Sequence, residues 1–185
     1  MDETADEELM LNYAKGNARA FEQLYTRHKG ALYRFMLRSV SEPALAEELF
    51  QETWFKVIRA RSSYRPDAKF TTWLYHIAGN ILIDHYRKNG KWDEALEADE
   101  EALCTVPAVD YELPEQQTHA NRQIQRLLDC LALLPAAQKQ VFLLKEEAGL
   151  AIEEIAAALN AGKEAIKSRM RYAIQKLREC MGELL

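Results

Sequence analysis

The side chains best placed to do chemistry are basic and lie near the end of the chain, in GLAIEEIAAALNAGKEAIKSRMRY, residues 149–172. Two short apolar-periodic stretches flank the turn 160–162, whose residues tolerate left-handed backbone. The second stretch places basic and hydroxyl side chains on its outer face: Lys163, Lys167, Ser168, Arg171 and Tyr172. Such side chains hydrogen-bond to base edges and phosphates, so the pattern favours a helix-turn-helix that binds DNA. An ordinary helical hairpin with a solvated basic face is the alternative.

Aromatic and basic residues alternate in a second segment, RPDAKFTTWLYHIAGNILIDHYRK, residues 65–88. Aromatic faces can stack unpaired bases while Lys and Arg contact the phosphates. Aromatics at helical spacing are more often core residues, and this is expected in part for Phe70, Trp73 and Ile77. Tyr64, His76 and Asn80 are the better candidates for exposed contacts.

A third segment, AEELFQETWFKVIRA at residues 46–60, gathers acidic and amide groups on one face. Neighbouring carboxylates could serve acid–base chemistry or hold a metal, but no histidine or cysteine completes such a site. A solvated helix face is the simpler interpretation. The sequence also contains no Gly-rich phosphate loop and no nucleophile–base pair. No catalytic residue, metal site or cofactor is therefore predicted, and an enzyme is disfavoured.

The three cysteines, Cys104, Cys130 and Cys180, are odd in number and far apart, and they form no CxxC pair. A disulfide framework is not expected, and buried or idle thiols are the preferred interpretation. A regulatory thiol at Cys104 is a weaker alternative.

Charge is distributed unevenly along the 185 residues, whose net charge is −5. Residues 93–121 hold nine acidic residues and no Lys or Arg, whereas the flanking parts each carry a small positive excess. The acidic total therefore leaves both flanks free to present basic faces to DNA. The first residues lack the features of a secretory signal, and no run is long and apolar enough to span a bilayer, so a cytoplasmic protein is expected.

Apolar residues recur at helical spacing on both sides of this acidic segment, and no stretch alternates as a strand does. Helices are predicted at 5–15, 18–39, 43–60, 68–88, 122–134, 136–147, 151–159 and 163–180. The acidic segment buries too little apolar surface to offset its ordering entropy and reads as a flexible linker. The prediction is an all-α protein with two small helical domains, 1–90 and 122–185, joined by a linker at 91–121.

Four motifs occur in one order along the chain: AFEQLYTRHKGALYRF, AEELFQETWFKVIRA, FTTWLYHIAGNILIDHYRK, and LPAAQKQVFLL followed by IEEIAAALNAGKEAIKSRMRYAIQKL. In this order the chain resembles the extracytoplasmic-function sigma factors of the sigma-70 family. The resemblance covers nearly everything outside the linker. It implies a bacterial RNA polymerase sigma factor that binds core polymerase, recognises −35 and −10 promoter elements and promotes DNA melting.

The resemblance also assigns residues to three surfaces. It implies docking on the clamp of the polymerase largest subunit through Glu47, Glu48, Leu49, Gln51, Glu52 and Phe55. It implies capture of a flipped base and single strand of the −10 element through Tyr64, Arg65, Lys69, Thr72, Trp73, His76, Asn80, Arg87 and Lys88. It implies recognition of the −35 duplex through Lys163, Lys167, Ser168, Arg169, Arg171 and Tyr172.

The implied partners are core RNA polymerase, including the flap of its second-largest subunit, promoter DNA, and a separate anti-sigma factor that masks these surfaces. No membrane insertion is implied, only indirect tethering through an anti-sigma factor. The linker would lie near the polymerase active-site cleft. The turn, with Asn160 and then Gly162-Lys163-Glu164-Ala165, departs from the Gly-rich turns of relatives and leaves the −35 sequence open. The competing class is a helix-turn-helix regulator that binds duplex DNA unaided, commonly as a dimer.

Overall fold

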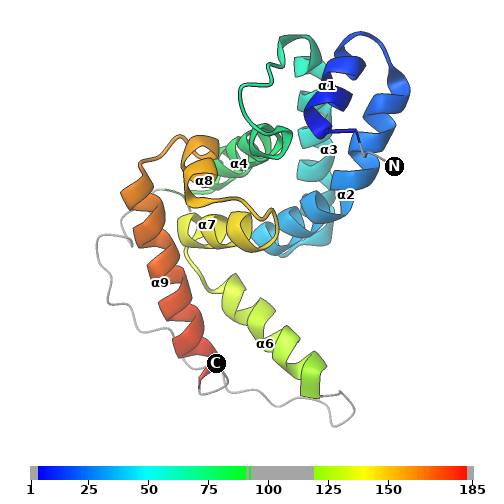
Figure 1. The fold of residues 1–185 in the computed structure, drawn as a ribbon. Coiled ribbons are helices and arrows are strands. Elements are labelled where there is room, and N and C mark those ends of the chain that lie inside the picture. Colours follow the sequence, from blue (N-terminus) through cyan, green and yellow to red (C-terminus); the bar gives the residue numbers. More distant parts are fainter. Residues whose placement is uncertain (1–3, 91, 93–118, 183–185) are drawn as a thin grey trace.

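The computed structural model describes residues 4–90, 92 and 119–182, and every regular element in these ranges is a helix (Figure 1). The helices are α1 (Asp6–Ala14), α2 (Ala18–Val40), α3 (Pro43–Ala60), α4 (Phe70–Lys88), α6 (His119–Ala132), α7 (Ala136–Glu146), α8 (Ile152–Ala158) and α9 (Lys163–Met181), with a short 3-10 helix at Arg61–Ser63. Each predicted helical range overlaps one of these helices. The all-α fold class is therefore confirmed.

Local signals in the sequence set several helix ends. The Asn17 side chain caps α2 by accepting a hydrogen bond from the Arg19 backbone N–H at 3.1 Å. Ser41 ends α2 in a left-handed conformation with φ of 61°, and Pro43 then opens α3 at a position that requires no N–H donor. Pro135 separates α6 from α7, because a proline disfavours helical geometry in the residue that precedes it.

Helices α1 to α4 pack around one apolar core (Figure 1). Phe35 of α2 and Tyr75 of α4 meet edge to face at its centre, with ring centroids 5.3 Å apart. Phe70, at the start of α4, is fully buried, whereas Trp73 and Ile77 are only partly buried against the same core. The predicted partial core role of these three residues is confirmed.

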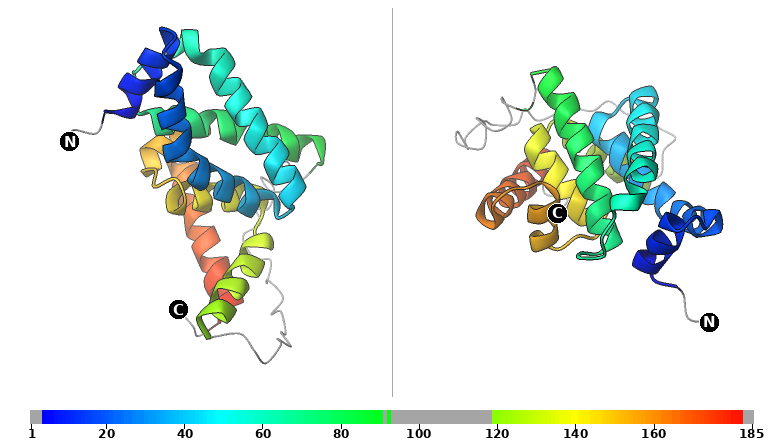
Figure 2. Two further views of the ribbon diagram at one scale, coloured as in Figure 1. Left: turned by 90° about the vertical axis from the view of Figure 1, so that its right-hand side faces the viewer. Right: turned by 90° about the horizontal axis from the view of Figure 1, so that it is seen from above.

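Helices α6 to α9 form the second group, in which α7 is the most buried element. Helix α9 packs against α6, α7 and α8, and both α6 and α9 extend away from the α1–α4 bundle (Figures 1 and 2). Ile155 of α8 and Ile166 of α9 are fully buried, and Leu159 beside them is nearly so. The apolar side chains of the two stretches that flank the turn therefore form the inner side of the helical hairpin.

The two groups lie directly against each other, with α8 on α4 and α7 on α2 (Figure 2). Of the predicted linker, residue 91 and residues 93–118 lie outside the described residues, and residues 119–121 belong to α6. Trp92 is buried and stacks on Tyr86 of α4, with the two rings 9° from parallel. This position therefore packs against the first bundle. The domain boundaries themselves stay predictions.

Candidate polymerase and nucleic-acid interfaces

The outer face of α9 exposes three of the six predicted −35 residues to solvent. Lys163, Lys167 and Arg171 are exposed, while Ser168, Arg169 and Tyr172 are half-buried. The turn before α9 follows the expected chemistry only in part. Asn160 takes the left-handed conformation with φ of 49°, but Gly162 has an ordinary φ of −69° and stands at the N-cap of α9. The hairpin therefore holds the basic face outward.

Acidic residues that were not predicted as functional partner the lysines of this face. Lys167 Nζ lies 2.8 Å from Glu164 Oε1, and this hydrogen bond raises the pKa of Lys167. Lys163 Nζ lies 3.4 Å from Glu153 of α8. The Arg171 guanidinium lies over the Tyr172 ring, 5.1 Å from its centroid. Binding a phosphate or a base edge would therefore require the lysines to exchange an internal partner for an external one.

The acidic face of α3 is exposed in the predicted manner at Glu47, Glu48, Gln51 and Glu52. Phe55 is 62% exposed, and it borders an apolar hollow of about 280 Å³ formed with Tyr25, Phe50, Trp54 and Ile58. Leu49 is only 4% exposed and belongs to the core, so its prediction as a surface contact is wrong. The apolar stripe of α3 contains Leu49, and this position was the signal for burial. A hydrophobic spot edged by carboxylates results.

Residues of the loop before α4 and of its first turns are less accessible than predicted. Tyr64 and Thr72 are 6% and 7% exposed, so neither is an exposed contact. Tyr64 packs on Phe70 and Trp73, with ring centroids 6.3 Å and 5.0 Å away. Burial, and next to it the negative charges of Glu7, Asp6 and Asp67, raise the pKa of Tyr64 to about 12. The tyrosine is therefore an aromatic support for Phe70 and Trp73. The exposed members of the predicted −10 set are Arg65, Lys69, Asn80, Arg87 and Lys88.

Two residues of the predicted −10 surface contact α8 or its cap. His76 Nδ1 donates a hydrogen bond to the Ala158 carbonyl at 2.8 Å, because a carbonyl can only accept. His76 Nε2 then accepts from the Asn80 amide at 3.1 Å. Lys69 Nζ lies 2.9 Å from Glu154 of α8. In this arrangement the second helical group covers part of the predicted −10 surface.

Further contacts between the two helical groups involve residues that were not predicted. Gln140 of α7 is 1% exposed, and its amide donates to the Gly79 carbonyl of α4 at 3.1 Å. Glu147, after α7, pairs with Arg34 at 3.3 Å and with Arg38, both on α2. A Cβ atom at Gly79 would lie 3.0 Å from Leu159 Cδ2, so α4 approaches the second group closely at this glycine.

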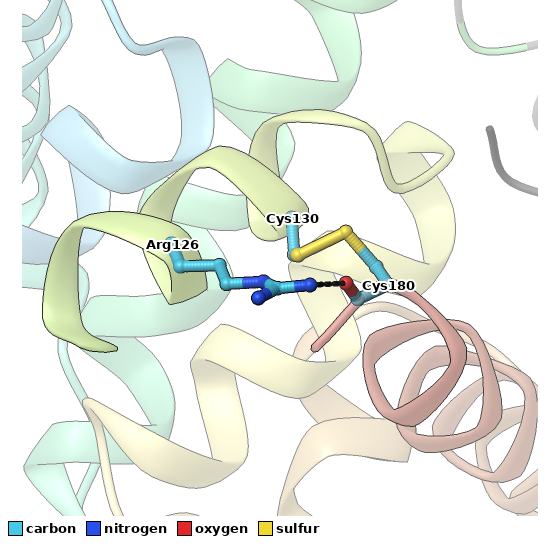
Figure 3. Close-up of a disulfide and its surroundings, with 3 residues drawn as sticks. All are labelled: Arg126, Cys130 and Cys180. Atoms are coloured by element: carbon cyan, nitrogen blue, oxygen red, sulfur yellow. Dashed lines mark hydrogen bonds between the residues drawn. A yellow bond between two sulfur atoms is a disulfide. The ribbon is translucent and has the colours of Figure 1, made fainter. Parts of the chain in front are cut away.

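Cys130 of α6 and Cys180 of α9 form a disulfide, which contradicts the expectation of unpaired thiols (Figure 3). Their Cα atoms are 5.9 Å apart although 50 positions separate them in the sequence. Both are buried, and Arg126 Nη2 donates to the Cys180 carbonyl beside the bridge at 3.3 Å. Pairing depends on how α6 packs on α9, which the spacing of the cysteines does not indicate. Cys104 lies outside the described residues.

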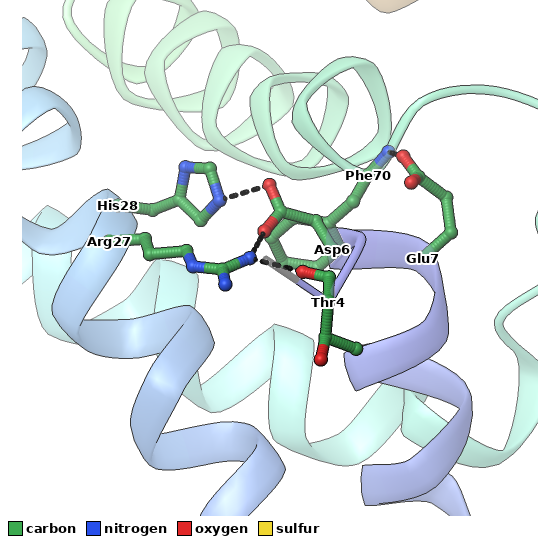
Figure 4. Close-up of polar contacts among 6 residues, drawn as sticks. All are labelled: Thr4, Asp6, Glu7, Arg27, His28 and Phe70. Atoms are coloured by element: carbon green, nitrogen blue, oxygen red, sulfur yellow. Dashed lines mark hydrogen bonds and ion pairs between the residues drawn. The ribbon is translucent and has the colours of Figure 1, made fainter. Parts of the chain in front are cut away.

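A polar cluster at the start of the chain joins α1 to α2 and α4 (Figure 4). Arg27 Nη1 donates to the Thr4 carbonyl and to Asp6 Oδ1, both at 2.7 Å. His28 Nε2 lies 2.7 Å from Asp6 Oδ2, and Glu7 Oε1 accepts from the Phe70 backbone N–H at 2.7 Å. None of these residues except Phe70 was singled out in the sequence, since their partners lie on other helices.

No group of three or more His, Cys, Asp or Glu side chains in the described ranges has the arrangement of a metal site. Among these residues, no helix is long and apolar enough to cross a membrane.

Two family models match this chain, sigma-70 region 2 over residues 24–91 and sigma-70 region 4 over residues 130–179. Across almost the whole length, the chain is 33% identical to the RNA polymerase sigma factor CarQ of Myxococcus xanthus, covering 95% of this chain and 97% of that one. The chain belongs to the sigma-70 family, as an extracytoplasmic-function sigma factor. The family suggested by the four motifs is thus confirmed, and α9 is the helix of region 4 that follows the turn.

Other relatives place the sigma factor in the same group. It is 31% identical to the sigma factor CnrH of Cupriavidus metallidurans over 95% of this chain and 93% of that one. The solved structure of CnrH in complex with the cytosolic domain of CnrY has a TM-score of 0.68 and 25% identity, covering 94% of this chain and 95% of that one. The structure of RpoE with the anti-sigma factor NepR from Bartonella quintana, 23% identical with a TM-score of 0.68 over 91% of this chain, shares the fold. The protein is an RNA polymerase sigma factor, a transcription initiation factor.

Proposed function

We propose that three surfaces of this sigma factor each bind a different partner. The acidic face of α3 with Phe55 binds the clamp of core RNA polymerase, the loop before α4 and the outer side of α4 take the −10 element, and the basic face of α9 takes the −35 duplex. The observation that carries the proposal is the outward face of α9. Lys163, Lys167 and Arg171 are all exposed there, while the opposite side of the hairpin is buried. A helix presented in this way can enter a major groove with its first turns at the base edges.

The proposal assigns the −10 element chiefly to exposed side chains. Arg65, Lys69, Arg87 and Lys88 supply positive charge for phosphates, and Asn80 supplies an amide for base edges. Trp73 is half-buried, and His76, also half-buried, becomes available where α8 separates from α4. Tyr64 and Thr72 support this surface from inside.

The proposal assigns polymerase docking to the apolar hollow around Phe55 and its rim of carboxylates. An exposed aromatic surrounded by charge is the composition of an interaction hot spot rather than of a solvated helix face. The flap of the second-largest subunit would then contact the region-4 helices. The proposed domains are residues 1–90 and 122–185, joined by the acidic linker.

A separate anti-sigma factor is proposed to mask these surfaces, supported by the similarity to CnrH, which was solved with the cytosolic domain of CnrY. The protein is proposed to act in the cytoplasm, where core polymerase and promoters are, and to carry no catalytic activity of its own.

The experiment that tests this function combines a pull-down with run-off transcription, using core RNA polymerase and a promoter library. Stable association and initiation at a shared −35 and −10 pair is the expected result. Glu48→Lys should weaken polymerase association, while Glu22→Lys, a matched change on the exposed face of α2, should not. Duplex DNA bound by the protein alone, without polymerase association, would instead indicate a helix-turn-helix regulator with its own operator.

A further inference from the structure

Helix α4 has no side chain of its own that caps its N-terminus. Lys69 stands at the N-cap position and makes no capping hydrogen bond. The first N–H groups of a helix have no partner within it and need an external acceptor. Trp73 and His76, in the first two turns of α4, belong to the proposed −10 surface. The geometry of that surface therefore depends on what holds the first turn of α4.

The acceptor comes from α1, 63 residues earlier in the chain. Glu7 Oε1 accepts the Phe70 backbone N–H at 2.7 Å (Figure 4). A carboxylate there meets an unpaired donor and also the positive end of the helix dipole, so it is a charged cap supplied by another helix. Phe70 itself is fully buried, which fixes the capped turn against the core.

Contacts to α2 hold helix α1 in place right beside Glu7. The neighbouring Asp6 spans two side chains of α2, with Oδ1 on Arg27 and Oδ2 on His28, each at 2.7 Å. Leu9 and Met10 bury the other side of α1 in the core. The His28 ring lies 5.3 Å from the Phe70 ring, so the anchor and the capped residue are in one cluster. Helix α1 itself precedes the residues that match sigma-70 region 2, which begin at residue 24.

We propose that Glu7 is a positioning residue for −10 recognition. Its carboxylate, aligned by the pairing of Asp6 with Arg27 and His28, fixes the first turn of α4. Through Phe70, whose ring contacts both Tyr64 and Trp73, it sets the position of the loop that precedes α4. This inference rests on the proposed placement of the −10 surface on α4.

The test uses holoenzyme assembled from the full chain and core polymerase, on a promoter with the fluorescent base 2-aminopurine in the −10 element. Its fluorescence rises when the base leaves the stack. Glu7→Ala should lower the yield of this signal roughly fivefold, about the effect of losing one helix cap. Glu7→Gln keeps an acceptor oxygen and should restore most of the signal. Glu8→Ala, an exposed acid on the same turn of α1, is the matched control and should leave the signal unchanged.

Three further measurements distinguish positioning from general stability. Polymerase affinity and −35 duplex binding should stay within twofold of wild type in Glu7→Ala. Base preferences selected from a library should relax at −10 positions and stay the same at −35 positions. Equal losses in polymerase binding, −35 binding and −10 opening would mean that Glu7 only keeps the protein folded, and would overturn the inference.

Asn80→Ala separates failure of the inference from failure of the proposed function, because Asn80 is an exposed member of the proposed −10 surface. If Asn80→Ala lowers the fluorescence and Glu7→Ala does not, the positioning role is wrong and the −10 surface stands. If Asn80→Ala and Glu7→Ala both leave the signal unchanged, the −10 surface is misplaced and the inference falls with it.

Discussion

The two helices proposed to contact promoter DNA, α4 and α9, present their candidate residues in different ways. On α9 Lys163, Lys167 and Arg171 are exposed, and the two lysines pair with the nearby surface acids Glu153 and Glu164. Near the start of α4, Thr72 is buried and His76 is hydrogen-bonded to the Ala158 carbonyl of α8. In this conformation α9 can meet a duplex directly, whereas α4 can meet DNA fully only after α8 moves away.

The difference follows from the position of α8, which contacts both helices. Toward α9 it contributes the buried apolar side of the helix-turn-helix, centred on Ile155. Toward α4 it contributes polar contacts through Ala158 and Glu154, which are easier to exchange for water, beside the Leu159 side chain that packs against Gly79. Separation of the two helical groups therefore need not disturb the helix-turn-helix. On the proposed assignment, duplex recognition would use a surface that is already exposed, whereas strand capture would use one that α8 partly covers.

Removing the disulfide between α6 and α9 should have the largest effect on stability. The disulfide links two helices of the second group and does not involve α4. Replacing Cys130 and Cys180 together by Ser should lower the free energy of unfolding by about 4 kcal/mol, the chain-entropy value for a closed loop of 50 residues. Denaturant unfolding followed by circular dichroism, with and without reductant, measures it. Cys104→Ser should leave the transition unchanged. Identical midpoints for the double variant and the oxidised protein would contradict the prediction.

Removing basic groups from α9 should weaken duplex binding without affecting the α4 side. Lys167→Ala and Arg171→Ala should each cost about 1–3 kcal/mol in binding a −35 duplex if they touch bases. Loss of a phosphate contact alone would weaken all sequences equally and reduce the salt dependence. Competition binding of holoenzyme to promoters with altered −35 elements makes the measurement. Lys145→Ala, on the exposed side of α7, is the control that should have no effect.

The helices could be predicted from the sequence because their signals are local. Apolar residues repeat at helical spacing within each one, and Pro43 and Pro135 mark boundaries through their own backbone geometry. The burial of Leu49 was also present in that spacing, and it was the family resemblance that assigned the residue to a surface. The apolar stripe was the better guide there.

The contacts that could not be predicted join residues distant in sequence. Glu7 and Phe70, His76 and Ala158, and the two bridged cysteines come together only when whole helices pack. Nothing in the local spacing of an acid or a cysteine identifies a partner 50 or more positions away. The burial of Tyr64 has the same origin, because it lies between α4 and the acids of α1.

Adding one methyl group at Gly79 should separate α4 from the second helical group. The new Cβ would lie 3.0 Å from Leu159 Cδ2 and 3.3 Å from Gln140 Nε2. Leu159 can shift slightly, so Gly79→Ala should weaken the contact by roughly 1 kcal/mol, at the low end for overpacking. The radius of gyration from small-angle X-ray scattering should increase, and binding of a −10 single strand should improve.

Gly30→Ala is the matched control for Gly79→Ala. It also replaces a helical glycine, so both variants gain the same helix propensity of about 1 kcal/mol. Its Cβ would meet only the Arg34 side chain, at 3.4 Å. An equal radius of gyration for both variants would show that the close approach at Gly79 does not hold the two groups together.

The smallest effect is expected from acid, and it distinguishes the two sides of α8. The hydrogen bond from the Ala151 backbone N–H, and next to it the one from Lys69, hold the pKa of Glu154 below its usual value. The stabilisation is therefore complete above the unfolded pKa of about 4.3 and is lost as the pH falls through the lower folded value. The Gly79 amide resonance in NMR spectra should thus shift as the α4 contact loosens below about pH 4. Glu154→Gln should abolish this pH dependence, whereas Glu153→Gln, whose partner Lys163 belongs to α9, should preserve it.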